Sequence, residues 1–308
     1  MTPSPRRAWI ALAEMPNIHR AMILAVVSTL CAATTNGIIR TLSGEMHPFE
    51  IVFFRSLIGL LIFVPVIGRI GFARLKPRRL GLQLVRGGIH GVSILLFYLA
   101  LSLSPLAKVS ALSFSAPLFA TLLALLILGE VIRARRITAL VVGFLGTLLI
   151  VRPGWGALDI GATAVLVSSA MGGIVSIIIK VLSHTDSSLT TTLFGLLVTT
   201  PVALIAAIPV WTTPSLGQLL PLIGIGTISV LSNLCRTQSL KEADITVVAP
   251  FEFLALPWVA LIGYAYFSEV PDIWTWIGGA IIFVATSYIA YRERHIKSEG
   301  STAGSGVA

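Results

Sequence analysis

Charged residues and cysteines are scarce in this chain, and their scarcity narrows the class of protein. Only 11% of the 308 residues are charged, 56% are hydrophobic, and the mean hydropathy is +0.93. A water-soluble domain of this size cannot bury so much apolar side chain, so lipid must surround much of it. Cys31 and Cys235 both fall in long apolar segments. We interpret them as small apolar fillers and not as a disulfide or a metal pair.

The chain also lacks the motifs of enzymes and of nucleotide-driven pumps. It contains no Walker A, HExxH, CxxC or nucleophile-elbow sequence. We therefore expect neither an enzyme nor an ATP-driven pump, and neither a cofactor nor a resident metal. We predict no cleavable signal peptide, because Glu14 and Pro16 interrupt the apolar stretch that follows Arg6 and Arg7.

Long apolar segments fill most of the chain. A membrane-spanning helix needs about 20 mainly apolar residues. Ten such windows fit: 21–40, 48–67, 81–103, 106–128, 136–152, 159–181, 189–209, 216–237, 244–267 and 273–291. The prediction is an all-α polytopic membrane protein with ten transmembrane helices.

Two sequence echoes indicate an internal duplication. Residues 27–43 return at 167–183 after a shift of 140, and residues 128–130 return at 267–269 after a shift of 139. The two echoes lie about a hundred residues apart and have almost the same offset, which indicates one duplicated unit. With ten predicted helices, each copy contains five. Because five is odd, the second unit must enter the membrane upside down, as in many secondary transporters.

This duplication sets the predicted organisation of the chain. We expect a cytoplasmic N-terminal segment at 1–17, a first repeat at 18–153, a second and inverted repeat at 157–292, and a disordered cytoplasmic tail at 293–308.

The net charge of +9 indicates membrane topology and argues against a nucleic-acid partner. With the ten helices in place, 17 of the 22 Lys and Arg residues fall on the side of the termini. Only Arg40 and Arg152 fall on the other side, so the positive-inside rule places both termini in the cytoplasm. Arg55, Arg86 and Lys108 lie within predicted helices, and we expect Arg86 to snorkel toward the cytoplasmic end.

Ionisable residues within membrane helices are candidates for a substrate or proton site. His90 lies near the middle of 81–103, and Glu252 is the only carboxylate deep in any predicted span. The structural alternatives are a neutral His90 bonded to a backbone carbonyl, and a Glu252 paired with Arg55, Arg86 or His90. If protons drive transport, His90 or Glu252 should carry them.

Prolines and small residues predict where helices bend and where they pack closely. Pro117, Pro250 and Pro257 are expected to mark bends, since each leaves a carbonyl that something else must satisfy. Small residues at spacing four, Ser28 and Ser168 among them, predict close helix packing. Glu130 and Glu269, at equivalent repeat positions, are expected to cap helices or to pair with basic residues.

These features together resemble the drug/metabolite transporter superfamily, in its ten-helix EamA-type branch. The residues that carry the resemblance are Phe53-Phe54-Arg55, Tyr98-Leu99-Ala100-Leu101, Ser115-Ala116-Pro117, Leu128-Gly129-Glu130, Leu256-Pro257, Ser268-Glu269 and Ile277-Gly278. The chain departs from the pattern at Ser268, where glycine is common, and at Glu252, which adds a charge. The resemblance implies a carrier of the bacterial inner membrane that works by alternating access, often as an exporter of amino acids, metabolites or toxic compounds.

The resemblance also implies a central cavity, lined by the first, third, fourth, sixth, eighth and ninth helices. The substrate-binding candidates are Asn36, His90, Phe97, Tyr98, Phe114, Met171, Asn233, Glu252 and Trp258. Aromatic rings with a few polar groups suit amino acids, including aromatic ones. Sugar phosphates would need a cluster of inward Arg and Lys residues, which this set lacks.

The predicted function is export of amino acids or related small metabolites by a monomer or weak dimer. An organic-cation exporter that uses Glu252 and an aromatic cage is the alternative. A non-transporting membrane scaffold or a lipid flippase is the second alternative.

Overall fold

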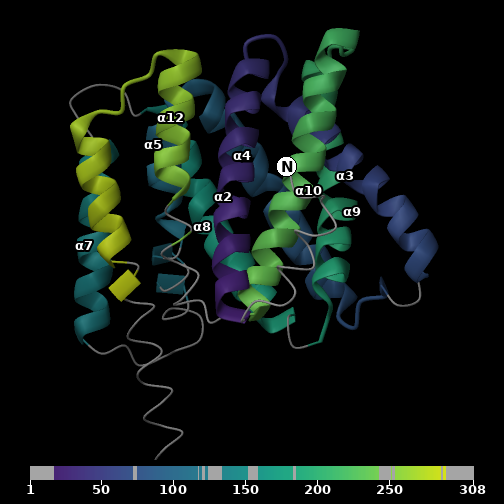
Figure 1. Cartoon of the computed structure of the whole chain (residues 1–308), viewed down its shortest axis with the longest axis horizontal. Helices are drawn as coiled ribbons and strands as arrows, with labels where there is room; N and C mark the ends of the chain where they lie inside the picture. Colours follow the sequence, from purple (N-terminus) through teal and green to yellow (C-terminus); the bar gives the residue numbers. More distant parts are fainter. Residues whose placement is uncertain are drawn as a thin grey trace, which may run out of the picture.

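A computed structural model describes residues 17–71, 75–116, 118–119, 122–123, 134–151, 159–182, 185–242, 251, 254–285 and 287–288. Helices are the only regular secondary structure within these ranges. They are α2 (Asn17–Leu42), α3 (Pro48–Ile70), α4 (Leu80–Leu103), α5 (Leu106–Ser113), α7 (Ala134–Val151), α8 (Ile160–Leu182), α9 (Ser188–Ala207), η2 (Ile208–Val210), α10 (Leu216–Glu242), α12 (Ala255–Phe267) and the helix Ile273–Ala285 (Figure 1).

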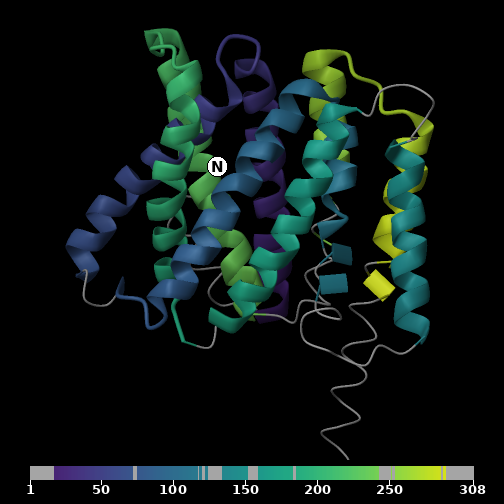
Figure 2. The same cartoon turned by 180° about the vertical axis from the view of Figure 1, so that it is seen from behind.

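The helices have the length and apolar character of a membrane bundle. Six of them are long and apolar enough to cross a bilayer, and Ala255–Phe267 and Ile273–Ala285 are shorter apolar helices. Viewed from behind, the long helices run alongside one another (Figure 2). Large apolar side chains face outward from them, with Leu61 59% exposed and Ile205 70% exposed. The predicted all-α polytopic membrane fold is confirmed.

Polar residues at the helix starts explain where several helices begin. His47 caps α3, since its Nδ1 accepts from the Phe49 amide while Glu50 accepts from the His47 amide. Ser187 caps α9 by accepting from the Thr190 amide at 3.0 Å.

Helix α5, which begins the predicted span 106–128, ends early. Helix α5 stops at Ser113, and Phe114 and Ser115 form a turn before helical residues resume. A proline ring clashes with the carbonyl four residues before it, and Ser113 is the residue four before Pro117. Pro117 itself lies outside the described residues.

Contacts at one end of the bundle show that equivalent helices of the two repeats run in opposite directions. Arg40, near the end of α2, donates to the Leu101 carbonyl near the end of α4 at 2.7 Å. Ser104 follows α4 and donates to Asp159, which precedes α8, at 3.2 Å. Helices α2 and α4 therefore end where α8 begins, so α8 is inverted relative to α2.

Two reciprocal serine pairs join the helices that pack across the repeats, α2 against α10 and α4 against α8. Ser28 Oγ donates to the Ser232 carbonyl at 3.0 Å, and Ser232 Oγ donates back to the Ser28 carbonyl at 2.9 Å. Ser93 and Ser168 repeat this arrangement at 3.0 and 2.8 Å. A shift of 140 takes Ser28 to Ser168, and a shift of 139 takes Ser93 to Ser232. The two pairs are therefore equivalent, and the predicted role of the small residues in packing is confirmed for Ser28 and Ser168.

Glycines let α4 approach α9 closely. A Cβ at Gly87 would lie 2.6 Å from the Val198 Cβ, and one at Gly91 would lie 3.1 Å from the Val202 Cγ1. A side chain at Gly87 would therefore force α4 and α9 apart, whereas one at Gly91 would need Val202 to shift by a few tenths of an ångström.

Candidate functional site

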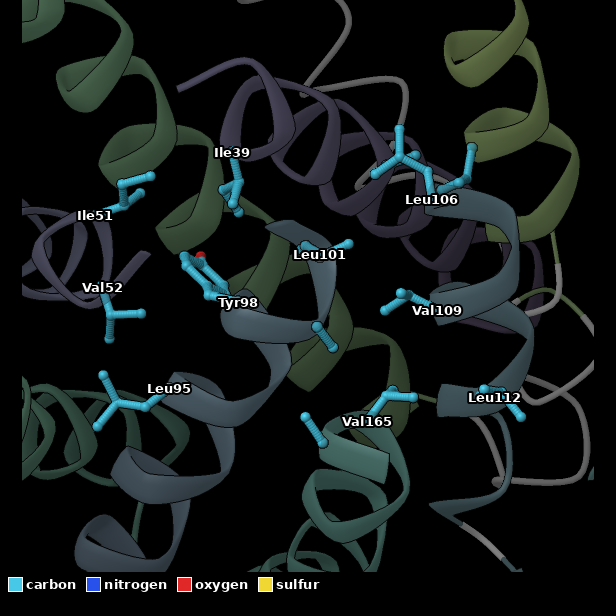
Figure 3. Packing of buried hydrophobic residues seen from close by; sticks show 14 of the residues in the cluster. Ile39, Ile51, Val52, Leu95, Tyr98, Leu101, Leu106, Val109, Leu112 and Val165 are labelled. Atoms are coloured by element: carbon cyan, nitrogen blue, oxygen red, sulfur yellow. The ribbon is translucent and has the colours of Figure 1, made fainter. Parts of the chain in front are cut away.

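Four of the predicted aromatic residues belong to one apolar cluster in the interior. Tyr98 is 2% exposed, and its ring lies among buried aliphatic side chains, including Ile39 of α2 and Leu101 of its own helix α4 (Figure 3). Phe97, Phe114 and Trp258 are half-buried and pack against the same cluster. The Phe97 and Tyr98 ring centroids are 6.4 Å apart. The sequence predicted these rings as a group, and the structure brings them together.

Arg55 lies beside this cluster, where α3, α4 and α10 meet. Its Nε donates to Ser229 Oγ on α10 at 2.9 Å, and its Cζ lies 5.7 Å from the centroid of the Tyr98 ring on α4. This cation–π geometry and the hydrogen bond fix the guanidinium from two sides. Sequence reasoning placed Arg55 within a helix but missed it as a site residue, although a charge in an apolar run was a usable signal.

His90 lies in a positively charged part of the interior. Its side chain is half-buried on α4, and the charges of the buried Arg86, the half-buried Arg55 and the exposed Arg236 act on it. The sequence did not predict that these arginines lie near His90, because they belong to three different helices. The field at His90 thus favours an anionic over a cationic neighbour.

The expected snorkelling of Arg86 is wrong. Arg86 is only 8% exposed, and its Nη1 donates to the Thr191 carbonyl of α9 at 2.8 Å. Gly195 makes room for the guanidinium, because a Cβ there would lie 2.9 Å from Arg86 Nη1. Arg86 therefore packs between α4 and α9, and its guanidinium does not reach water, although its partner Thr191 lies near the start of α9.

The remaining candidates occupy different surroundings. Asn36 on α2 and Met171 on α8 are half-buried, whereas Asn233 on α10 is exposed. Trp258 has a buried Nε1 that has no hydrogen-bond partner among the described residues. Pro257 lies in the first turn of α12, where its missing N–H breaks no helical hydrogen bond.

Glu252, Pro117 and Pro250 lie outside the described residues. A bend at each proline and proton carriage by His90 or Glu252 stay predictions.

Acidic residues at the helix ends have structural roles. Glu269 accepts from Arg40 at 3.4 Å and from the Leu106 amide, at the start of α5, at 3.0 Å. Its predicted pairing with a basic residue is confirmed. Asp159 pairs with Lys108 at 2.6 Å.

In the part of the chain that the structure describes, no group of three or more His, Cys, Asp and Glu residues could hold a metal ion. Cys31 is half-buried, Cys235 is buried, and both are free thiols. Their predicted role as apolar fillers agrees with this placement.

Comparison with known proteins identifies the family. The family model described as the EamA-like transporter family matches residues 19–152 and again residues 159–291. The chain belongs to the EamA-like transporter family. Members of this family fall in the drug/metabolite transporter superfamily, as the sequence motifs predicted, and they are transporters and not enzymes.

Named relatives of this EamA-like transporter differ in what they carry and in direction. An S-adenosylmethionine uptake transporter of Rickettsia bellii is 28% identical over 88% of this chain and 94% of its own length. The pseudopaline exporter CntI of Pseudomonas aeruginosa is 30% identical over 87% and 95%. A riboflavin transporter of Vibrio cholerae is 30% identical over 77% and 80%.

A solved crystal structure confirms the fold of this EamA-like transporter. It covers 89% of this chain and 95% of its own chain, with a TM-score of 0.59 and 19% sequence identity. At this identity the likeness concerns the fold alone.

Proposed function

We propose that this transporter exports amino acids, including aromatic ones, or related small metabolites by alternating access through a cavity between its two repeats. The observation that supports it is the Tyr98 ring, which lies against the Arg55 guanidinium and 6.4 Å from the Phe97 ring, within the apolar cluster that Trp258 also contacts. Small-molecule sites commonly combine such an apolar lining with a few placed polar groups.

The relatives support a solute of this size. Their names give S-adenosylmethionine, pseudopaline and riboflavin as cargo, and all three are small organic molecules. S-adenosylmethionine carries the ammonium and carboxylate groups of its methionine part. The relatives include both uptake and export proteins, so they favour neither direction of transport. Export is our proposal for this chain.

The electrostatics disfavour an organic-cation substrate. Arg86 and Arg55 act on His90 from α4 and α3. None of the three ion pairs between described side chains involves Arg55 or Arg86. A cation would meet the charges of Arg55 and Arg86, which no ion pair between described side chains balances, whereas an anionic group is attracted by them.

We further propose an inner-membrane location with both termini in the cytoplasm, and a monomer or weak dimer. Lys and Arg residues gather on the side of the termini, which supports this orientation.

Counterflow tests the proposed function. The purified full-length protein is reconstituted in liposomes loaded with one unlabelled amino acid, and uptake of the same labelled amino acid is measured. We expect saturable uptake that internal substrate accelerates, with aromatic amino acids among the best. Protein-free liposomes are the control, and riboflavin and S-adenosylmethionine serve as comparison solutes.

Uptake that neither saturates nor responds to internal substrate would contradict the amino-acid proposal. Direction is measured separately in cells preloaded with a labelled substrate. Export predicts faster loss of label from cells that express the protein than from cells that do not. Faster accumulation instead would show an uptake protein.

A further inference from the structure

Arg55 carries a positive charge within the bundle that no described acidic residue balances. It lies about two turns into α3, so about 10 Å from the start of that helix. The ion pairs between described side chains join Arg20 to Glu242, Arg40 to Glu269 and Lys108 to Asp159, all at helix ends. An unpaired charge at this depth is costly, so it faces a water-filled space or a ligand.

The guanidinium is held so that one edge stays available. Ser229, which is 5% exposed, accepts the Nε hydrogen bond, and the guanidinium carbon lies over the Tyr98 ring. Nη1 and Nη2 donate no hydrogen bond to any described residue, and the side chain is only half-buried. A planar fork with two free nitrogens matches the two oxygens of a carboxylate.

The other interior cations are not available in this way. Arg86 is buried and already donates to the Thr191 carbonyl. Lys108 is paired with Asp159 at 2.6 Å.

We infer that Arg55 binds a carboxylate group of the transported substrate through Nη1 and Nη2, with Ser229 and Tyr98 as positioning residues. The ring of Phe97, 6.4 Å from that of Tyr98, offers apolar surface for the rest of the molecule. This inference deepens the proposed function and rests on it for the substrate. The site itself recognises a carboxylate whether or not an amino group is present.

A pair of probes that differ only in the carboxylate tests the site. Binding of 3-phenylpropanoate and of 3-phenylpropanamide to the purified full-length protein is measured by calorimetric titration. Since hydrogen bonds between charged groups are the strong ones, we expect the carboxylate to bind about 10- to 100-fold more tightly than the amide. Arg55→Gln should abolish this preference, and Arg55→Lys should reduce it because one ammonium cannot replace the fork.

Two further variants separate positioning from folding. Ser229→Ala leaves the charge but frees the guanidinium to rotate, so we expect a several-fold weaker carboxylate preference with amide binding unchanged. Arg69→Gln removes an exposed cation of the same helix and should keep the wild-type preference. If Arg55→Gln is not monodisperse, Arg55→Lys and Ser229→Ala decide the outcome.

The site is overturned if wild-type protein binds the two probes equally or binds neither. It is also overturned if Arg55→Lys and Ser229→Ala both keep the wild-type ratio. Amino-acid counterflow distinguishes the two proposals. Saturable counterflow with an Arg55-independent preference refutes the site alone, whereas an Arg55-dependent preference without amino-acid counterflow refutes only the amino-acid substrate.

Discussion

Asp159 has two roles at the single position before α8. Its carboxylate accepts from the Gly161 amide at 3.0 Å, which caps the helix, and from Lys108 Nζ at 2.6 Å. The hydrogen bond from Lys108 lowers the pKa of the Asp159 carboxyl below its ordinary value. The two side chains are 23% and 36% exposed, so water screens their attraction.

We expect Asp159→Asn to lower the free energy of unfolding at pH 7 by up to about 1 kcal/mol. Asparagine keeps the helix cap and loses only the ion pair, which is partly exposed. Because the folded-state pKa is depressed, the carboxylate stabilises the fold above its unfolded pKa of about 4. That contribution is lost as the pH falls through the folded-state value. Thermal unfolding in detergent at pH 7 and pH 3 measures both.

Asp159→Ala serves as the comparison, since it also removes the cap and should cost about 1 kcal/mol more. A gap between wild type and Asp159→Asn that is as large at pH 3 as at pH 7 would contradict an ion-pair origin.

Arg86 and Arg55 show what sequence reasoning could and could not predict for single side chains. The short distance of Arg86 from the cytoplasmic loop suggested snorkelling. The position of its side chain is instead determined by α9, which supplies the Thr191 carbonyl and the space at Gly195. Arg55 could be flagged as a charge in an apolar run, yet Ser229 is 174 residues away in sequence. Spacing along one helix cannot reveal such partners.

The two serine pairs should contribute alike to the stability of the bundle, because they occupy equivalent positions in the two repeats. We expect Ser28→Ala with Ser232→Ala, and Ser93→Ala with Ser168→Ala, each to cost about 1 kcal/mol. Single interhelical hydrogen bonds in membrane proteins average about 0.6 kcal/mol, and each double variant loses two. Unfolding of the purified variants in detergent measures these costs.

A double-mutant cycle provides the internal control. Ser28 and Ser232 should be coupled, whereas Ser28 and Ser168, which contact different helices, should be additive. Additive effects within a pair, or a cost confined to one of the two pairs, would contradict equivalent roles.

At the scale of helices, the lengths of the apolar runs predicted most helices well. They did not predict which helices pack against one another. The predicted window 48–67 became Pro48–Ile70, and 81–103 became Leu80–Leu103. The run 106–128 did not reveal that α5 stops at Ser113, although Pro117 predicted a bend nearby. The packing of α4 on α9 depends on Gly87 meeting Val198, a match that no single segment contains.

The whole molecule has two ends that can be told apart by their contacts. The loop after α2 meets the first turn of α10, where Gln218 donates to Glu45 at 3.1 Å. At the other end, Asp186 accepts from the Arg78 amide at 3.0 Å, which joins the segment before α4 to the segment before α9. These contacts agree with helices that alternate in direction, but charge alone predicts which end faces the cytoplasm.

Cysteine labelling in intact cells tests that orientation. In a background with Cys31→Ala and Cys235→Ala, we expect a membrane-impermeant thiol reagent to label Glu45→Cys. We expect Thr185→Cys, its equivalent after a shift of 140, to react only after the cells are permeabilised, because the second repeat is inverted.

Lys76→Cys and Thr213→Cys extend the orientation test, since both side chains are exposed at opposite ends of the bundle. Thr213→Cys should follow Glu45→Cys, and Lys76→Cys should follow Thr185→Cys. Labelling of Lys76→Cys in intact cells with protection of Thr213→Cys would reverse the predicted orientation. Labelling of Glu45→Cys and Thr185→Cys from the same side would contradict the inverted repeat itself, because equivalent positions of antiparallel repeats must face opposite sides of the membrane.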